Sequence, residues 1–180
     1  MNFNRSIYFF NKLAYYLISM DEKLLKFINY LLTPPPYRIF CDKLHGFNQQ
    51  EFIQLISDLF EALGCQVTPG PKGPDETIDL MCETGSGNYT IQCKKWRWDH
   101  KVKVKDVREV YGAAVKHKAA GVLIVTTSDF TENARQFSYG LEPPRVGFID
   151  GKQLFDLMKQ HLPDVVSRIL NPPSSEANRA

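Results

Sequence analysis

The sequence predicts an α/β domain in which helices flank a mixed β-sheet. A hairpin is expected between residues 77 and 96, because apolar and polar residues alternate on both sides of the Gly-rich break Thr84–Asn88. The continuous apolar run Gly121–Thr127 is short enough to be a buried strand. Amphipathic helical patterns precede and follow these strands, which is typical of a sheet covered by helices.

The turn of the hairpin sets which residues face each other. If Gly85 and Ser86 form a two-residue turn with glycine first, Leu80 lies opposite Ile91, and Ile78 lies opposite Cys93. This register gives the hairpin one apolar face directed at the core.

The other face of the hairpin collects polar groups of three kinds. Asp79 lies opposite Gln92, with Lys94 one diagonal step away. A carboxylate binds Mg²⁺ through oxygen, and a neighbouring lysine can orient water and offset charge on a phosphoryl oxygen. A slip of one residue would move Asp79 away from Gln92, so this interpretation depends on the register.

The remaining elements follow from helical periodicity, short apolar runs and capping residues. Before the hairpin we expect a helix over Asn48–Leu63 that ends at Gly64, a short strand over Cys65–Thr68 and a loop over Pro69–Pro74. After it we expect helices over 105–118, about 130–139, 151–160 and 163–170, and a strand over 145–149. Ser128, Asp129 or Thr131 is available to cap the helix over about 130–139, and Asp150 caps the helix over 151–160.

A basic and aromatic loop directly follows the polar face. It comprises Lys94, Lys95, Trp96, Arg97, Trp98, His100, Lys101, Lys103 and Lys105, with Asp99 as its local acid. Lysine and arginine neutralise DNA phosphates, and aromatic rings stack on bases or sugars. We therefore predict DNA contacts from Lys95, Arg97, Lys101 and Lys103. The alternative is a solvated run of charges with the tryptophans packed against the core.

The sequence resembles the Mrr-like (type IV restriction) endonuclease family of the PD-(D/E)xK restriction-endonuclease-like superfamily. The matching stretches are Phe52–Gly64, Ile78–Leu80, Ile91–Lys94, Val107–Ala113, Val125–Thr127, Phe130–Ala134 and Ile149–Gly151. They occur in the family's order and at similar spacing over residues 46–160. The resemblance implies a restriction-endonuclease-like fold.

The same resemblance implies a Mg²⁺-dependent (or Mn²⁺-dependent) DNA endonuclease that acts in restriction of foreign or modified DNA or in DNA repair. Asp79 and Gln92 would ligate the metal, together with the backbone carbonyl of Cys93. Lys94 would position the attacking water or stabilise the phosphoryl transition state. RNA stays open as a substrate.

Two departures from the family pattern concern acidic groups. The family helix usually carries Glu directly after the phenylalanine, where this chain has Ile53; Glu51 lies two residues earlier and receives no role. The family's Asp-Gly-Gly before the strand is Asp75-Glu76-Thr77 here, so Asp75 or Glu76 is a candidate second carboxylate. The departure at Ile53 favours a rival reading, a catalytically inactive DNA-binding module of the same fold.

The chain is predicted to have three parts. Residues 1–45 form an N-terminal helical extension and a Pro-rich linker, residues 46–170 form the endonuclease-like domain, and residues 171–180 form a disordered tail. The extension is expected to pack on the domain or on a second copy, as a homodimer contact. A membrane-surface or regulatory helix pair is the alternative, and it would make this an interaction protein. The extension has no run long enough to span a bilayer.

Composition adds few constraints. The net charge of +2 says nothing about nucleic acid, and the four cysteines lack a Cys-x-x-Cys pair, which favours reduced thiols in a cytoplasmic protein. The sequence has no Gly-rich phosphate-binding loop before a helix, so we expect no nucleotide cofactor.

Overall fold

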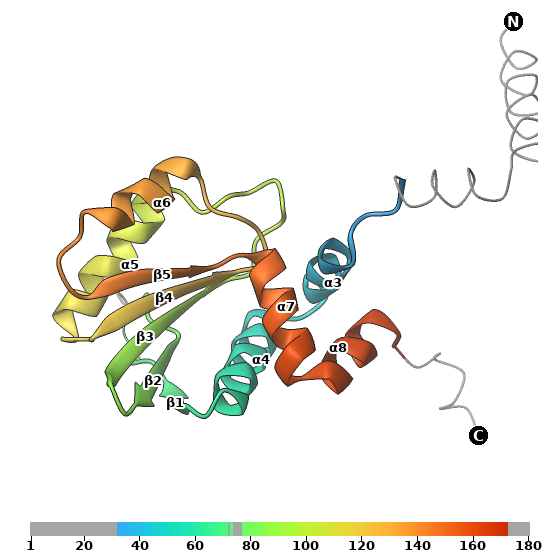
Figure 1. Cartoon of the computed structure of the whole chain (residues 1–180), viewed down its shortest axis with the longest axis horizontal. Helices are drawn as coiled ribbons and strands as arrows, with labels where there is room; N and C mark the ends of the chain where they lie inside the picture. The colour runs from blue at the N-terminus through green and yellow to red at the C-terminus, as the bar shows by residue number, and fades with distance from the viewer. Residues whose placement is uncertain (1–31, 72, 74–76, 173–180) are drawn as a thin grey trace, which may run out of the picture. The chain divides into compact units, whose positions relative to one another are not determined.

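The sheet is mixed and has five strands in the order β1-β2-β3-β4-β5. The computed structural model describes residues 32–71, 73 and 77–172 (Figure 1). The first three strands are antiparallel, and β3, β4 and β5 are parallel. Their bounds are Gln66–Pro69 (β1), Leu80–Thr84 (β2), Gly87–Lys94 (β3), Gly121–Thr126 (β4) and Arg145–Ile149 (β5). The predicted α/β class with a mixed sheet is confirmed.

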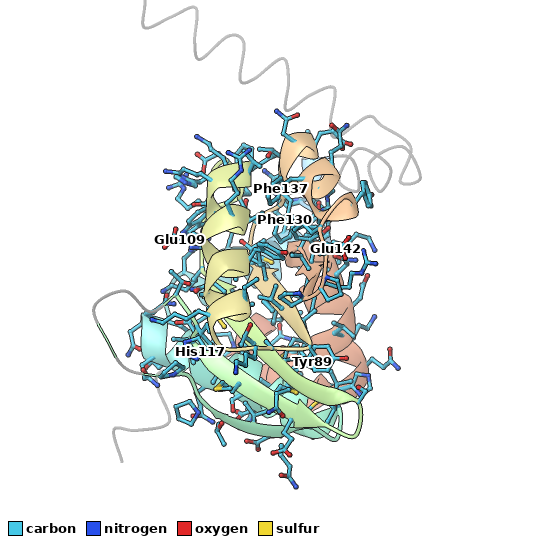
Figure 2. All side chains as sticks on the ribbon, turned by 90° about the vertical axis from the view of Figure 1, so that its left-hand side faces the viewer. Tyr89, Glu109, His117, Phe130, Phe137 and Glu142 are labelled. Atoms are coloured by element: carbon cyan, nitrogen blue, oxygen red, sulfur yellow. The ribbon has the colours of Figure 1, made fainter. Side chains whose placement is uncertain are left out.

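Helices cover both faces of the sheet, and each face has its own apolar core (Figure 1). On one face, α4 (Gln49–Ala62) and α7 (Gly151–His161) pack on the strands, and α3 (Pro36–Leu44) and α8 (Pro163–Leu170) pack on α7 in the same core. The other is covered by α5 (Val104–Lys116) and α6 (Glu132–Tyr139). Figure 2 looks onto the second face and shows Phe130 and Phe137 between α5 and α6, with Glu109 on the outer side of α5.

The hairpin register is confirmed from the turn to Leu80. Leu80 pairs with Ile91, and the connection between β2 and β3 is Gly85 and Ser86. The glycine with a positive φ is Gly87 (133°) rather than Gly85, so the turn differs from the predicted form with its special glycine first. A Cβ at Gly87 would lie 2.9 Å from the Cβ of Ala120, which is a second reason for glycine there.

The stop at Gly64 is confirmed, with a φ of 86° directly after the final cap of α4. The capping box of Asn48 and Glu51 at the start of α4 was not predicted. The side chain of Thr131 caps α6, and that of Asp150 caps α7. These caps fix where the helices begin beside the sheet.

Helix α3 is absent from the sequence-based prediction, which treated Pro34–Pro36 as a stop and a link. Proline is well suited to the first position of a helix, and Pro36 occupies it. Phe40 of α3 is fully buried, and its ring centroid lies 5.4 Å from that of Phe155 on α7. The compact unit therefore begins at Pro36, ten residues before the predicted boundary at residue 46.

Some predictions lie outside the described residues: the helices over residues 1–31, most of the 171–180 tail, and the candidate carboxylates Asp75 and Glu76. The proposed dimer contact through residues 1–45 stays a prediction. Of the helices in the described part of the chain, none has the length and apolar character to cross a membrane. All four cysteines are free thiols.

If α3 is part of the core, Phe40→Ala should lower the free energy of unfolding by about 3–5 kcal/mol, because it leaves a cavity beside Phe155. Urea unfolding followed by circular dichroism measures this. Tyr139→Ala is the matched control, since Tyr139 is 79% exposed, and it should change stability by less than about 0.5 kcal/mol. Equal effects of the two substitutions would contradict the placement of α3.

Candidate active site

Asp79 lies where β2 separates from β3. Its backbone N–H donates to the carbonyl of Ile91 (3.0 Å), and its own carbonyl accepts from the N–H of Gly70 (2.9 Å). The strand pairing ends at Leu80 and Ile91, so the predicted pairing of Ile78 with Cys93 is not formed. The backbone of Asp79 is thus fixed between the end of β1 and β3.

The Asp79 carboxylate takes the place of the missing strand partner. Its Oδ2 accepts a hydrogen bond from the backbone N–H of Cys93 (2.7 Å) and another from Nε2 of Gln92 (2.6 Å). Two of the three predicted polar side chains are therefore in direct contact. The carboxylate thus gives the Cys93 N–H the acceptor that a backbone carbonyl of a paired strand would otherwise provide.

The electrostatic state of Asp79 reflects opposing influences. Burial raises the pKa of Asp79 above its ordinary value of 3.8, while the Cys93 N–H and the positive charge of Lys94 act to lower it. Lys94 is half-buried, and its Nζ lies 5.2 Å from the ring centroid of Trp96. Lys94 is thus the third member of the group, acting on Asp79 through its charge.

Gln92 and Cys93 present oxygen atoms beside Asp79. Gln92 is 8% exposed, and its Oε1 is buried without a hydrogen-bond partner. The carbonyl of Cys93 accepts from Nε2 of Gln49 on α4 (3.4 Å), which leaves its second lone pair for another contact. An unpaired buried acceptor is costly, and a cation is one partner that would satisfy it.

These oxygens fit a hard divalent cation. Mg²⁺ takes one or two protein carboxylates and completes its shell with water and substrate phosphate. Asp79, Gln92 and Cys93 offer a carboxylate, an amide oxygen and a carbonyl. Rotation of the Gln92 amide by half a turn would exchange Nε2 for Oε1 at the Asp79 side. No group of three or more His, Cys, Asp or Glu side chains that could hold a metal occurs in the described part of the chain.

A cleft of about 770 Å³ opens next to Asp79, between α4 and the start of β2. Ile53 lies in its wall, at the position where the resemblance leads us to expect Glu. The Glu51 carboxylate accepts from the Asn48 N–H (2.6 Å) in the capping box of α4, so its hydrogen bonding is used at the helix end. The cleft therefore receives an apolar side chain where the family has an acid.

The four predicted DNA contacts have different surroundings. Lys95 donates to the carbonyl of Phe47, and Lys101 pairs with Asp129 (2.7 Å). Arg97 is 72% exposed with Asp99 at 3.5 Å, and Lys103 is exposed at the start of α5. Lys95 and Lys101 thus have partners elsewhere in the fold, whereas Arg97 and Lys103 face solvent.

Sequence reasoning missed two residues, one at this site and one on the basic loop. Gln49 follows the helix cap and contacts the Cys93 carbonyl, and Arg38, in the helix that was taken for a linker, contacts Trp98 of the loop. Gln49 carries no signal of its own in a single sequence. Arg38 would have been considered if Pro36 had been read as the start of a helix.

Comparison with known proteins gives one family match and several relatives. The family described as restriction endonuclease (Mrr_cat) matches residues 44–158. The chain is 34% identical over 104 residues to the type IV methyl-directed restriction enzyme EcoKMrr of Escherichia coli (strain K12), covering 58% of this chain and 33% of that protein. It is 33% identical over 85 residues to the uncharacterized protein y4cE of Sinorhizobium fredii (strain NBRC 101917 / NGR234), covering 45% and 22%.

Among solved structures, the DNA modification-dependent restriction endonuclease AspBHI has a TM-score of 0.62 to this chain at 15% identity, covering 77% of this chain and 39% of that one. The mixed sheet and its flanking helices thus define a restriction-endonuclease-like domain. The family match extends over more than half of the chain, and the chain belongs to the Mrr_cat restriction endonuclease family. It spans about a third of the length of EcoKMrr.

The raised pKa of Asp79 predicts a pH dependence of stability. The folded protein holds this proton more tightly than the unfolded chain, so the contribution of Asp79 is present below pH 3.8 and is lost as pH rises through the raised pKa. Wild-type stability minus that of Asp79→Asn should therefore fall as pH rises through this window and then stay constant. Urea unfolding at a series of pH values measures the difference, and an increase with pH would contradict the assignment.

Proposed function

We propose that this chain is a divalent-cation-dependent DNA endonuclease that hydrolyses backbone phosphodiester bonds. The observation that carries the proposal is the contact of Asp79 with Gln92 and the Cys93 N–H, beside the charge of Lys94 and an unpartnered buried oxygen. Membership of a restriction endonuclease family supports the choice of DNA as substrate.

Each group has a chemical role in this proposal. The oxygens of Asp79, Gln92 and Cys93 would hold a Mg²⁺ or Mn²⁺ ion, which when bound would supply an activated water and a Lewis acid for a phosphoryl oxygen. The Lys94 ammonium orients the attacking water and offsets the negative charge that develops on the phosphate. Gln92 is buried, whereas Asp79 is half-buried in the wall of the cleft, which gives water and a phosphate access to its carboxylate.

The biological setting is proposed from the relatives. EcoKMrr is a methyl-directed restriction enzyme, and AspBHI is a DNA modification-dependent restriction endonuclease. We propose restriction of foreign or modified DNA for this chain, with DNA repair as the second setting. Homodimerisation through residues 1–45 would allow two copies to act on the two DNA strands.

A catalytically silent DNA-binding module is the second candidate function, and Ile53 favours it. A single carboxylate in the site binds a cation more weakly than two, and Ile53 occupies the wall where another acid would be expected. This candidate predicts DNA binding without strand cleavage at every metal concentration.

Plasmid nicking with Mg²⁺ or Mn²⁺ tests the proposed activity. Lys94→Ala should lower nicking by about 10²-fold or more, because it removes a charge that stabilises the transition state. Its affinity for DNA should stay within about threefold of wild type, since one phosphate contact among many is lost. Asp79→Asn should lose nicking and metal binding together. Nicking by either variant at the wild-type rate would refute these roles, and binding without nicking by the wild type would favour the silent module.

Restoring an acid at the cleft wall tests the cation site without relying on cleavage. Ile53→Glu should raise the affinity for Mn²⁺ about tenfold or more, because a carboxylate about 4 Å from a divalent ion adds attraction of about 2–8 kcal/mol. Isothermal titration calorimetry measures this affinity. Ala62→Glu, on the same helix but away from the cleft, adds the same charge and should leave the affinity unchanged. Equal effects would place the cation elsewhere.

A further inference from the structure

A stacked pair of side chains lies on the loop that leaves the candidate active site. The guanidinium carbon of Arg38, on α3, is 3.9 Å from the ring centroid of Trp98. Trp98 is nevertheless 52% exposed, so the guanidinium covers only part of the indole. The pair joins two segments 60 positions apart and belongs to none of the contacts assigned above.

Several hydrogen bonds hold the loop that carries Trp98. The carbonyl of Trp96 accepts from the Thr127 hydroxyl (2.7 Å), and the carbonyl of Trp98 accepts from the Ser128 hydroxyl (3.4 Å). Both hydroxyl residues are buried. These hydrogen bonds fix the backbone on either side of residue 97. A ligand that binds the exposed indole of Trp98 therefore costs little conformational entropy in the loop.

The chemistry of the pair points to a nucleotide. An exposed indole surface stacks on any nucleobase, and a guanidinium that lies over an aromatic ring still has N–H groups to donate to a phosphate. Arg97, which is 72% exposed, adds a second cation next to Trp98. An aromatic face with adjacent cations is complementary to a base and its phosphate.

The base must be unpaired, because bases inside a duplex are already stacked on both faces. We infer that Arg38 and Trp98 form a binding site for an unpaired nucleotide of a DNA strand that passes the candidate active site. The inference rests on the proposed nuclease function for the identity of the strand. Trp96, two residues before Trp98, contacts Lys94 and so connects the pair to that site.

Binding of fluorescein-labelled oligonucleotides to the full chain in EDTA tests the inference, with fluorescence anisotropy as the readout. A short oligothymidylate should bind at least about tenfold more tightly than an abasic strand with the same number of phosphates, because stacking contributes to affinity. Trp98→Ala should abolish this preference and Trp98→Phe should retain most of it. Tyr139→Ala is the control, because it removes another exposed aromatic ring, and it should leave the preference unchanged.

Arg38→Ala should weaken binding of both strands, since it removes a phosphate contact, while Arg97→Ala should do so without disturbing the stack. If oligothymidylate and abasic strand bind equally, or if Trp98→Ala changes only the melting temperature, the pair is a structural clamp between α3 and the loop and the inference is wrong. Because EDTA removes divalent cations, the oligonucleotide is not cleaved and the anisotropy reports binding alone. A base preference without nicking in Mg²⁺ would instead overturn the proposed nuclease alone.

Discussion

The carboxylate of Asp79 is the contact on which the arrangement of this site depends. It accepts the Cys93 N–H where β2 leaves β3, and so replaces a backbone partner at the end of the ladder. The same oxygen atom accepts from Gln92, which turns the amide toward the hairpin and leaves its Oε1 buried and unpaired. One side chain therefore both completes the sheet and sets the orientation of the amide beside it.

The two cores of the domain explain how that contact is kept in place. Ile91, Cys93 and Val125 belong to the core under α4 and α7, whereas Val122 and Ile124 belong to the core under α5 and α6. The central strands β3 and β4 are thus packed on both sides. This packing holds the polar groups at the strand ends in place. The basic loop continues from the end of β3 and is held by Thr127 and Ser128 from the end of β4. The candidate site and the basic loop are consequently carried by the same ends of β3 and β4.

Patterns of short range predicted most of this structure from sequence. Alternation and a two-residue turn predicted the pairing of Leu80 with Ile91. Helical periodicity predicted α4, and the cap residue Asp150 predicted the start of α7. Features that depend on distant neighbours were not predictable. The positive φ is at Gly87, whose neighbour Ala120 comes from another part of the chain, and α3 was hidden by a proline run that reads equally as a linker. Likewise, the partners of Lys95 and Lys101 are set by tertiary packing.

The central claim is that Asp79, Gln92 and Cys93 share one divalent cation. Anomalous diffraction from crystals grown with Mn²⁺ tests it most directly. If the three residues share the ion, a single strong peak should lie about 2.0–2.3 Å from a carboxylate oxygen of Asp79 and from the Cys93 carbonyl. The Gln92 amide should then be turned so that its Oε1 faces the ion. A Mn²⁺ peak away from these residues would contradict the shared cation site. So would a Gln92 Nε2 that still donates to Asp79 at saturating Mn²⁺.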